Sequence, residues 1–171
     1  MPLIRCAKKL QKEMGLSAGG LCNDDPDDSI LGSWHANLIF IDRKKCILFV
    51  NDKTLFNFLI PDLPRELIQN ISPIFVQFLT ATLVEEDFPR WFIDKVLGKN
   101  EKLSFGNTNS KKILGVMNDL AFHYEFRILE AGGVHSPYVP SIISKLNRMP
   151  MGPLKYAYSV DTLRAELNSA T

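Results

Sequence analysis

Asp119 and His123 form an acid–imidazole pair that the sequence places within reach. They lie four residues apart in "NTNSKKILGVMNDLAFHYEF" (107–126), so in a helix they would be neighbours on one face. A carboxylate beside an imidazole can raise its basicity, hold it as a general base or complete part of a metal site. As an exposed pair, the same residues would add only roughly a few tenths of a kcal/mol to stability. The pair therefore predicts either a small hydrolase or nuclease, or an ordinary surface contact.

His35 is the third catalytic candidate. It lies in "GSWHANL", just before the first run of a predicted sheet, where it and Trp34 could line the mouth of a pocket. A set of His35, Asp119 and His123 would suit a divalent metal if the fold brought the three together. We assign no metal and no cofactor from this pattern. His135, in "GGVHSP", is expected in a solvated turn.

Candidate binding residues surround the start of the same helical segment and a basic turn, "DRKK" (42–45). If that turn lies near the helix start, its cations and the free helix amides would form an anion site. Taken singly, each basic cluster is more typical of a solvated surface. The candidate ligand-binding residues are Asn109, Ser110, Gly115, Asn118, Arg43, Lys44 and Lys45.

Motifs of known enzyme classes give little support to catalysis. The chain contains no HExxH, no GxxxxGK[ST] and no GxGxxG. We therefore leave open whether it is an enzyme. The favoured interpretation is a soluble, non-enzymatic binding or regulatory module for a macromolecule or a small anion. The alternatives are a small hydrolase or nuclease that uses the Asp–His pair, and a purely structural or assembly role.

Composition limits the partners and the compartment. The 171 residues favour one domain, and 20 basic against 19 acidic residues give a net charge of +1. That balance does not favour nucleic acid or an anionic membrane. Cys6 and Cys46 lie in apolar runs and are expected to be buried, reduced thiols. With no apolar run near membrane-spanning length and no secretion signal, we expect a cytoplasmic protein. The partner is unknown; a protein partner or a homodimer, through an exposed strand or the aromatics around Trp91, stays open.

Short apolar runs predict a small sheet. "NLIFI" and "CILFV" are separated by "DRKK", and "NDKT" leads into a third run, "LFNFLI". Such spacing is typical of an antiparallel meander. The third run also fits a helix, but the short turn before it and Pro61 after it favour a strand. "PLIRCA" (2–7) and "EKLSFGNT" (101–108) are further strand candidates, the second at an edge.

Helical periodicity covers most of the remaining chain. We expect helices in 8–15, 64–98 and 136–149, with Pro73 separating or kinking two of them and Pro89 opening another. The central helix, 110–131, has Asn109 or Ser110 as its N-cap. Its core face is Ile113, Leu114, Met117, Leu120, Ala121, Tyr124 and Ile128. Because Phe122 and Phe126 lie opposite that face, we expect the helix to be buried on two sides.

The predicted fold is α+β: a small antiparallel β-meander packed against a central helix and several flanking helices. Residues 1–151 form a single domain in this prediction. Residues 152–171 form a C-terminal tail that is partly helical or frayed.

Four blocks together resemble a family of small bacterial proteins with a domain of unknown function. They are "LIRCAKKLQKEMG", "LGSWHANLIFIDRKKCILFVNDKTLFNFLIP", "NTNSKKILGVMNDLAFHY" and "KLNRMPM", spanning roughly residues 3–151. The resemblance implies no established activity, so it transfers no catalytic role. The matching positions are Arg5, Cys6, Asn37, Asp42, Cys46, Asn51, Asn109, Ser110, Gly115, Asn118 and Asp119.

Overall fold

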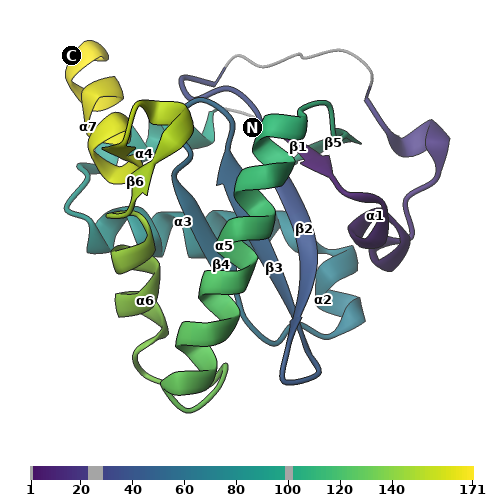
Figure 1. The fold of residues 1–171 in the computed structure, drawn as a ribbon. Coiled ribbons are helices and arrows are strands. Elements are labelled where there is room, and N and C mark those ends of the chain that lie inside the picture. Colours follow the sequence, from purple (N-terminus) through teal and green to yellow (C-terminus); the bar gives the residue numbers. More distant parts are fainter. Residues whose placement is uncertain (1, 23–28, 99–101) are drawn as a thin grey trace.

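A computed structural model describes residues 2–22, 29–98 and 102–171, and shows a five-stranded sheet with helices on both faces (Figure 1). The strands of the sheet are β1 (Leu3–Cys6), β2 (Trp34–Ile41), β3 (Lys44–Asn51), β4 (Asn57–Ile60) and β5 (Ser104–Asn107). The helices are α1 (Lys8–Met14), α2 (Arg65–Gln69), α3 (Ile71–Glu85), α4 (Arg90–Leu97), α5 (Lys111–Glu130), α6 (Val139–Leu146) and α7 (Ser159–Ser169). Short 3-10 turns at Ala18–Gly20 and Gly152–Leu154 and a small ribbon of β6 (Pro150–Met151) and β7 (Ala157–Tyr158) complete the described elements.

The sheet has the order β4-β3-β2-β1-β5. Strands β2, β3 and β4 form the predicted antiparallel meander, and the third run is a strand, as favoured. Strand β1 lies between β2 and β5 and is parallel to both, with Arg5 opposite His35 on one side and Gly106 on the other. The α+β prediction is confirmed, with the addition that the sheet is mixed.

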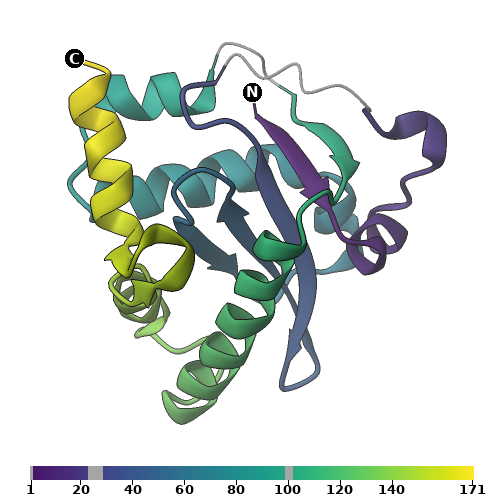
Figure 2. The same ribbon diagram turned by 45° about the horizontal axis from the view of Figure 1, so that its top comes forward.

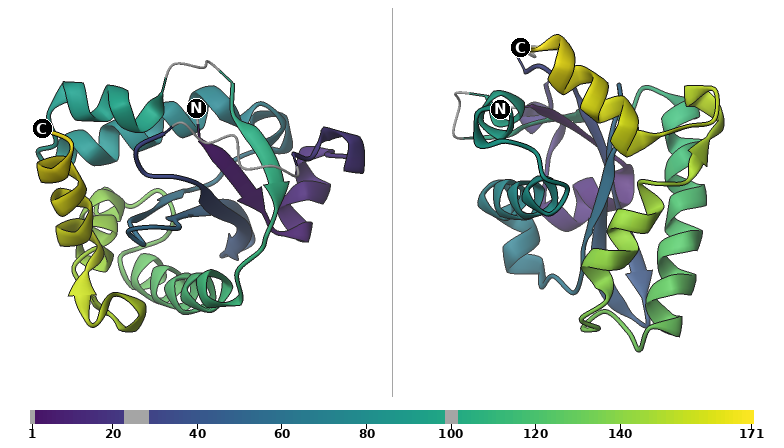
Figure 3. Two further views of the ribbon diagram at one scale, coloured as in Figure 1. Left: turned by 90° about the horizontal axis from the view of Figure 1, so that it is seen from above. Right: turned by 90° about the vertical axis from the view of Figure 1, so that its left-hand side faces the viewer.

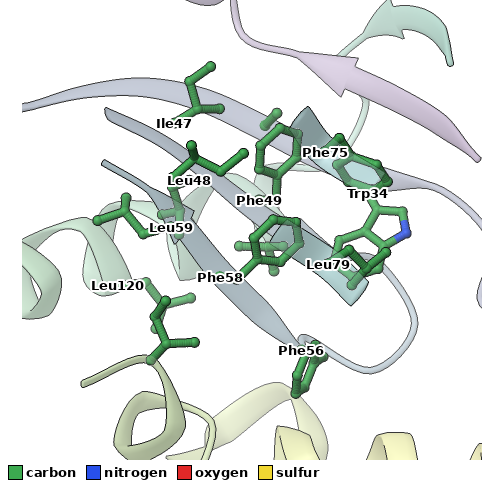
Figure 4. Packing of buried hydrophobic residues seen from close by; sticks show 14 of the residues in the cluster. Trp34, Ile47, Leu48, Phe49, Phe56, Phe58, Leu59, Phe75, Leu79 and Leu120 are labelled. Carbon is green, nitrogen blue, oxygen red and sulfur yellow. The ribbon is translucent and has the colours of Figure 1, made fainter. Parts of the chain in front are cut away.

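Helices cover the two faces of the sheet in separate layers (Figures 2 and 3). Helix α3 packs on one face over an aromatic cluster formed by Trp34, Phe49, Phe58 and Phe75. The ring centroids of Phe49 and Phe75 are 5.0 Å apart, and those of Trp34 and Phe75 are 5.8 Å apart. All four residues are almost fully buried (Figure 4). This cluster is the centre of the core, since aromatic side chains bury the most apolar area.

Helix α5 packs on the opposite face. Ser110 is its N-cap and accepts a hydrogen bond from the backbone N–H of Ile113 at 3.2 Å, as predicted. The expected second buried side is wrong, because Phe122 and Phe126 are 67% and 60% exposed. Asn118 is also exposed, rather than at the edge of the core. The reason is architectural: α6 lies beside α5, so α5 is the outermost layer over its own part of the sheet (Figure 3).

The helical region after the meander breaks one turn earlier than its proline suggests. Helix α2 ends at Gln69 and α3 begins at Ile71, so the break is at Asn70. Pro73 lies in the first turn of α3, where a missing N–H leaves no helical bond unmade. At the other end of the chain, α7 occupies most of the segment 152–171, and its Leu163 is fully buried in the core.

A buried polar network closes the outer edge of β4. The Asn147 side chain accepts a hydrogen bond from the Asn57 backbone N–H at 2.9 Å and donates one to the Asn57 carbonyl at 2.8 Å. Ser159 donates to the same side-chain oxygen at 2.9 Å, and the Tyr124 hydroxyl donates to the Asn57 side chain at 2.6 Å. All four residues have no measurable exposure. One amide side chain thus substitutes for a neighbouring strand and joins α5, the end of α6 and α7 to the sheet.

Candidate functional site: a pocket at the edge of the sheet

The three catalytic candidates, His35, Asp119 and His123, do not form one cluster. Asp119 Oδ1 and His123 Nε2 are 3.9 Å apart, and their side chains are 71% and 35% exposed. His35 is fully buried on β2, and its Nε2 accepts a 3.4 Å hydrogen bond from the backbone N–H of Asn109. Residue 123 lies 14 residues further along α5 than residue 109, which is about 20 Å at 1.5 Å per residue. His35 and His123 therefore belong to different regions of the molecule.

His35 instead links three elements. Its Nδ1 lies 2.6 Å from Asp52 Oδ1, just after β3, while its Nε2 takes the N–H of Asn109 just before α5. Both ring nitrogens are therefore used within the protein. A buried imidazole with two fixed partners positions strands and a helix start, and it has no nitrogen left to accept a substrate proton.

The basic turn and the start of α5 lie at opposite ends of the sheet (Figure 1). His35, the second residue of β2, contacts Asn109 just before α5. Arg43 comes eight residues after His35, about 26 Å away at 3.3 Å per residue. Lys45 forms an ion pair with Glu13 of α1 rather than facing α5. The condition for a combined anion site, a turn close to the helix start, is not met.

Gly115 has open space beside it. Apart from its chain neighbours and the backbone of its own helix, no atom of the described residues lies within 4 Å of a Cβ built at this position, and the residue is exposed. Glycine inside a helix costs about 1 kcal/mol relative to alanine. The packing of this chain gives no reason for that cost.

One enzyme-like pattern was missed by sequence reasoning. "GLSAG" (15–19) has the GxSxG spacing of a nucleophile elbow, in which serine stands on a strained turn between a strand and a helix. Here helix α1 precedes the pattern, a 3-10 turn (Ala18–Gly20) begins directly after Ser17, and Ser17 has an extended backbone (φ −97°, ψ 166°). The local structure is not that of a nucleophile elbow.

The buried thiols are poor nucleophiles. Burial raises the pKa of the Cys6 thiol to about 12 and also raises the pKa of Cys46. At neutral pH both groups are therefore protonated, and the thiolate is the reactive form. Across the described part of the chain, no group of three or more His, Cys, Asp or Glu side chains could hold a metal ion.

A cavity of about 320 Å³ lies at the outer edge of the sheet, between α3, β4, α6 and the loop after α5. Its wall is mainly apolar. The apolar side chains that line it include Leu59, Phe78, Ala81, Val134, Val139 and Ile143. Small-molecule sites generally have this composition and a volume of roughly 300–1,000 Å³. Sequence reasoning missed the pocket, because its lining comes from four separate segments and carries no motif.

A few polar side chains also line this pocket, among them Glu85, Glu86, His135 and Ser144. Glu86 forms a two-pronged ion pair with Arg148, with O–N distances of 2.6 and 3.0 Å. Ser144 also accepts from the same guanidinium, and His135 lies 2.8 Å from Asp62. Glu85 is exposed and forms no ion pair with any described residue. Glu85 is therefore the lining carboxylate without an ion pair among the described residues, whereas both Arg148 and Arg164 contact Glu86.

The Glu86–Arg148 pair predicts a pH-dependent stability. Burial raises the pKa of Glu86, but hydrogen bonds from Arg148 and Ser144 and nearby positive charge outweigh it, so this pKa is below its usual value. A carboxyl group whose pKa is lower in the folded than in the unfolded protein stabilises the fold. This stabilisation is complete at pH values above the pKa of the unfolded state, about 4.3, and is lost as the pH falls through the pKa of the folded state. Arg148 is 44% exposed, so we expect Glu86→Gln to cost about 1–2 kcal/mol near pH 7.

Urea unfolding of wild type and Glu86→Gln at pH 7, 5, 4 and 3 measures this effect. The difference in the free energy of unfolding is expected to be constant between pH 5.5 and 8 and to shrink below about pH 4.5. A difference that persists unchanged at pH 3 would contradict the assignment.

The fold and the pocket define a layered α+β protein with a small-molecule-sized cavity at one sheet edge. A family model described as a domain of unknown function, DUF6933, matches residues 3–162. The chain belongs to this family, and the match continues past residue 151, where the resemblance was expected to end. No curated protein and no solved structure matches the chain. Within residues 2–22, 29–98 and 102–171, none of the helices has the length and apolar character needed to cross a membrane.

Proposed function

We propose that this protein is a cytoplasmic, non-enzymatic binding module of bacteria, and that the pocket between α3, β4 and α6 receives its ligand. The observation that carries the proposal is the 320 Å³ cavity, whose lining is mainly apolar and includes a few polar side chains. Ligand sites combine an apolar wall with a few polar groups that orient the ligand. The buried thiols of Cys6 and Cys46 support the cytoplasmic assignment, and the family resemblance supports the bacterial one.

The charged residues of the lining indicate the class of ligand. The Glu86 carboxylate is paired with Arg148, and Arg164 donates to the Glu86 backbone carbonyl, whereas the exposed carboxylate of Glu85 forms no ion pair with any described residue. A ligand with an apolar body and a cationic head would fill the cavity and place its charge beside Glu85. A small anion would meet two carboxylates there, and the two guanidinium groups beside them, Arg148 and Arg164, already contact Glu86. We therefore favour a small cationic amphiphile over the small anion expected from the basic turn.

Two probes of equal chain length test this proposal. Decylamine and decanoate, both below their micellar concentrations, differ mainly in the sign of the head-group charge. We expect isothermal titration calorimetry to show binding of decylamine at least tenfold tighter than that of decanoate. Ala81→Trp, which adds a large ring to the cavity wall, is expected to abolish binding, and Glu85→Lys is expected to reverse the preference.

Matched controls separate the pocket from general effects. Ala165→Trp adds the same ring on an exposed site of α7, and Glu66→Lys makes the same charge change on α2. Both are expected to bind as wild type does. Equal binding of the two probes, or wild-type binding by Ala81→Trp, would refute the pocket as the ligand site.

The enzymatic alternative has less support. Its one contact is the exposed Asp119–His123 pair, which lacks a third group to orient the imidazole among the described interactions. A macromolecular ligand also has less support than a small one, because the basic residues Arg43, Lys44 and Lys45 lie in one hairpin and do not join the cations at the start of α5.

A further inference from the structure

An exposed apolar stripe runs along the outer face of α5. Phe122, Phe126 and Leu129 are 67%, 60% and 46% exposed, and their spacing puts them on one side of the helix. That side is directly opposite the buried face that contains Leu120 and Tyr124. Three large apolar side chains on one exposed helix face indicate a contact surface, since scattered single residues need no such explanation.

Gly115 and Asn118 continue this stripe toward the start of α5. Both are exposed, and the space above Gly115 is open. The glycine has no left-handed backbone angle, so its own conformation does not require it. A residue without a side chain on a contact face lets a large side chain of another molecule approach the helix closely. The stripe thus has open space above Gly115 at one end and the exposed side chain of Leu129 at the other.

We propose that α5 binds α5 of a second copy of this chain, antiparallel and about a two-fold axis through Phe122. In this arrangement Phe122 faces its own counterpart. Gly115 and Leu129 are each seven residues from Phe122, on opposite sides, so the gap of one copy receives the Leu129 of the other. An isologous pair of this kind closes on itself and leaves no surface for further growth.

Charges on the flank of the stripe favour this antiparallel arrangement. Lys112 is in the first turn of α5 and Glu130 is its last residue, and both lie on the same flank at nearly the same helical angle. Both are exposed, and neither takes part in an ion pair within the described residues. The two-fold axis brings Lys112 of each copy beside Glu130 of the other. The antiparallel helix dipoles also attract each other.

The size of the contact indicates how strong the dimer is. A buried Phe contributes roughly 150–250 Å², so the partly exposed stripe and its flanks bury on the order of 1,000 Å² in total. That is at the lower end for specific protein complexes. We therefore expect a reversible dimer with a dissociation constant in the micromolar range.

Sedimentation velocity from about 1 to 500 µM tests the proposal. Wild type is expected to shift from monomer to dimer across this range. Phe122→Glu places two carboxylates against each other at the axis and is expected to weaken the dimer at least tenfold. Val84→Glu, which alters an exposed apolar residue on α3, is the matched control and is expected to dimerise as wild type. Both substitutions are on the surface, so both variants are expected to fold, and circular dichroism checks that Phe122→Glu and Val84→Glu do.

A charge swap tests the register. Lys112→Glu and Glu130→Lys are each expected to weaken the dimer several-fold, whereas the double variant restores it, because the two-fold axis reverses both pairs together. A wild-type protein that stays monomeric at 500 µM overturns the proposal. So does a dimer that is insensitive to Phe122→Glu, or a double variant as weak as the single ones. A monomer whose Phe122 is needed for binding to lipid vesicles would assign the stripe to a membrane surface instead.

Discussion

Replacing Asn147 with alanine is expected to lower the free energy of unfolding by about 3–5 kcal/mol. The variant would leave both the backbone N–H and the carbonyl of Asn57 without partners in a fully buried site. Each buried polar group left unpaired costs about 1–3 kcal/mol. The loss also removes the nearer acceptor of Ser159, at 2.9 Å, and leaves it only the backbone carbonyl of residue 147 at 3.3 Å, so the link between the sheet edge and the start of α7 is weakened.

Equilibrium urea unfolding measures this loss, with two further variants that separate the contributions. Ser159→Ala removes one donor but keeps Asn57 paired, and is expected to cost about 1 kcal/mol. Asn118→Ala changes an exposed asparagine on α5 and is expected to stay within about 0.5 kcal/mol of wild type. If Asn147→Ala costs no more than Ser159→Ala, water replaces the amide, and the network does not hold the edge of β4.

Local sequence patterns predicted the helices and strands, but they did not predict contacts between residues far apart in the sequence. The meander follows from apolar runs, short polar turns and Pro61, all of which act within a few residues. The parallel pairing of β1 with β5 joins residues about 100 positions apart, and no local pattern encodes it. Asn147 is similar: it lies 90 residues from Asn57, and nothing around it in the sequence indicates that it closes a strand edge.

The candidate site shows the same limit. Helical spacing placed the apolar residue Phe122 on the face opposite the core. Spacing does not say whether another element covers that face, and in the structure Phe122 is exposed. It placed Asp119 beside His123, which is a local relation, and left the position of His35 open. The pocket needs α3, β4 and α6 together, so only the assembled fold reveals it.

The aromatic cluster under α3 is expected to be the most sensitive part of the apolar core. Phe75 is fully buried, and its ring contacts those of Trp34, Phe49 and Phe58 at centroid distances of 5.8, 5.0 and 5.7 Å. Phe75→Ala removes the ring at the centre of these contacts. Because the sheet and α3 cannot collapse fully into the space, we expect a loss of about 3–5 kcal/mol.

Substitutions of different size show whether the lost stability comes from the missing Phe75 ring or from a less stable helix α3. Phe75→Leu keeps much of the volume and is expected to cost about 1–1.5 kcal/mol. Val84→Ala, at an exposed site on the same helix, is expected to change stability by less than about 0.5 kcal/mol. Trp34 reports the packing directly, because its indole is fully buried in the cluster, so Phe75→Ala should also alter the near-ultraviolet circular dichroism of the folded protein. Equal losses for Phe75→Ala and Phe75→Leu would show that the surrounding side chains close the cavity, and that the cluster is not tightly packed.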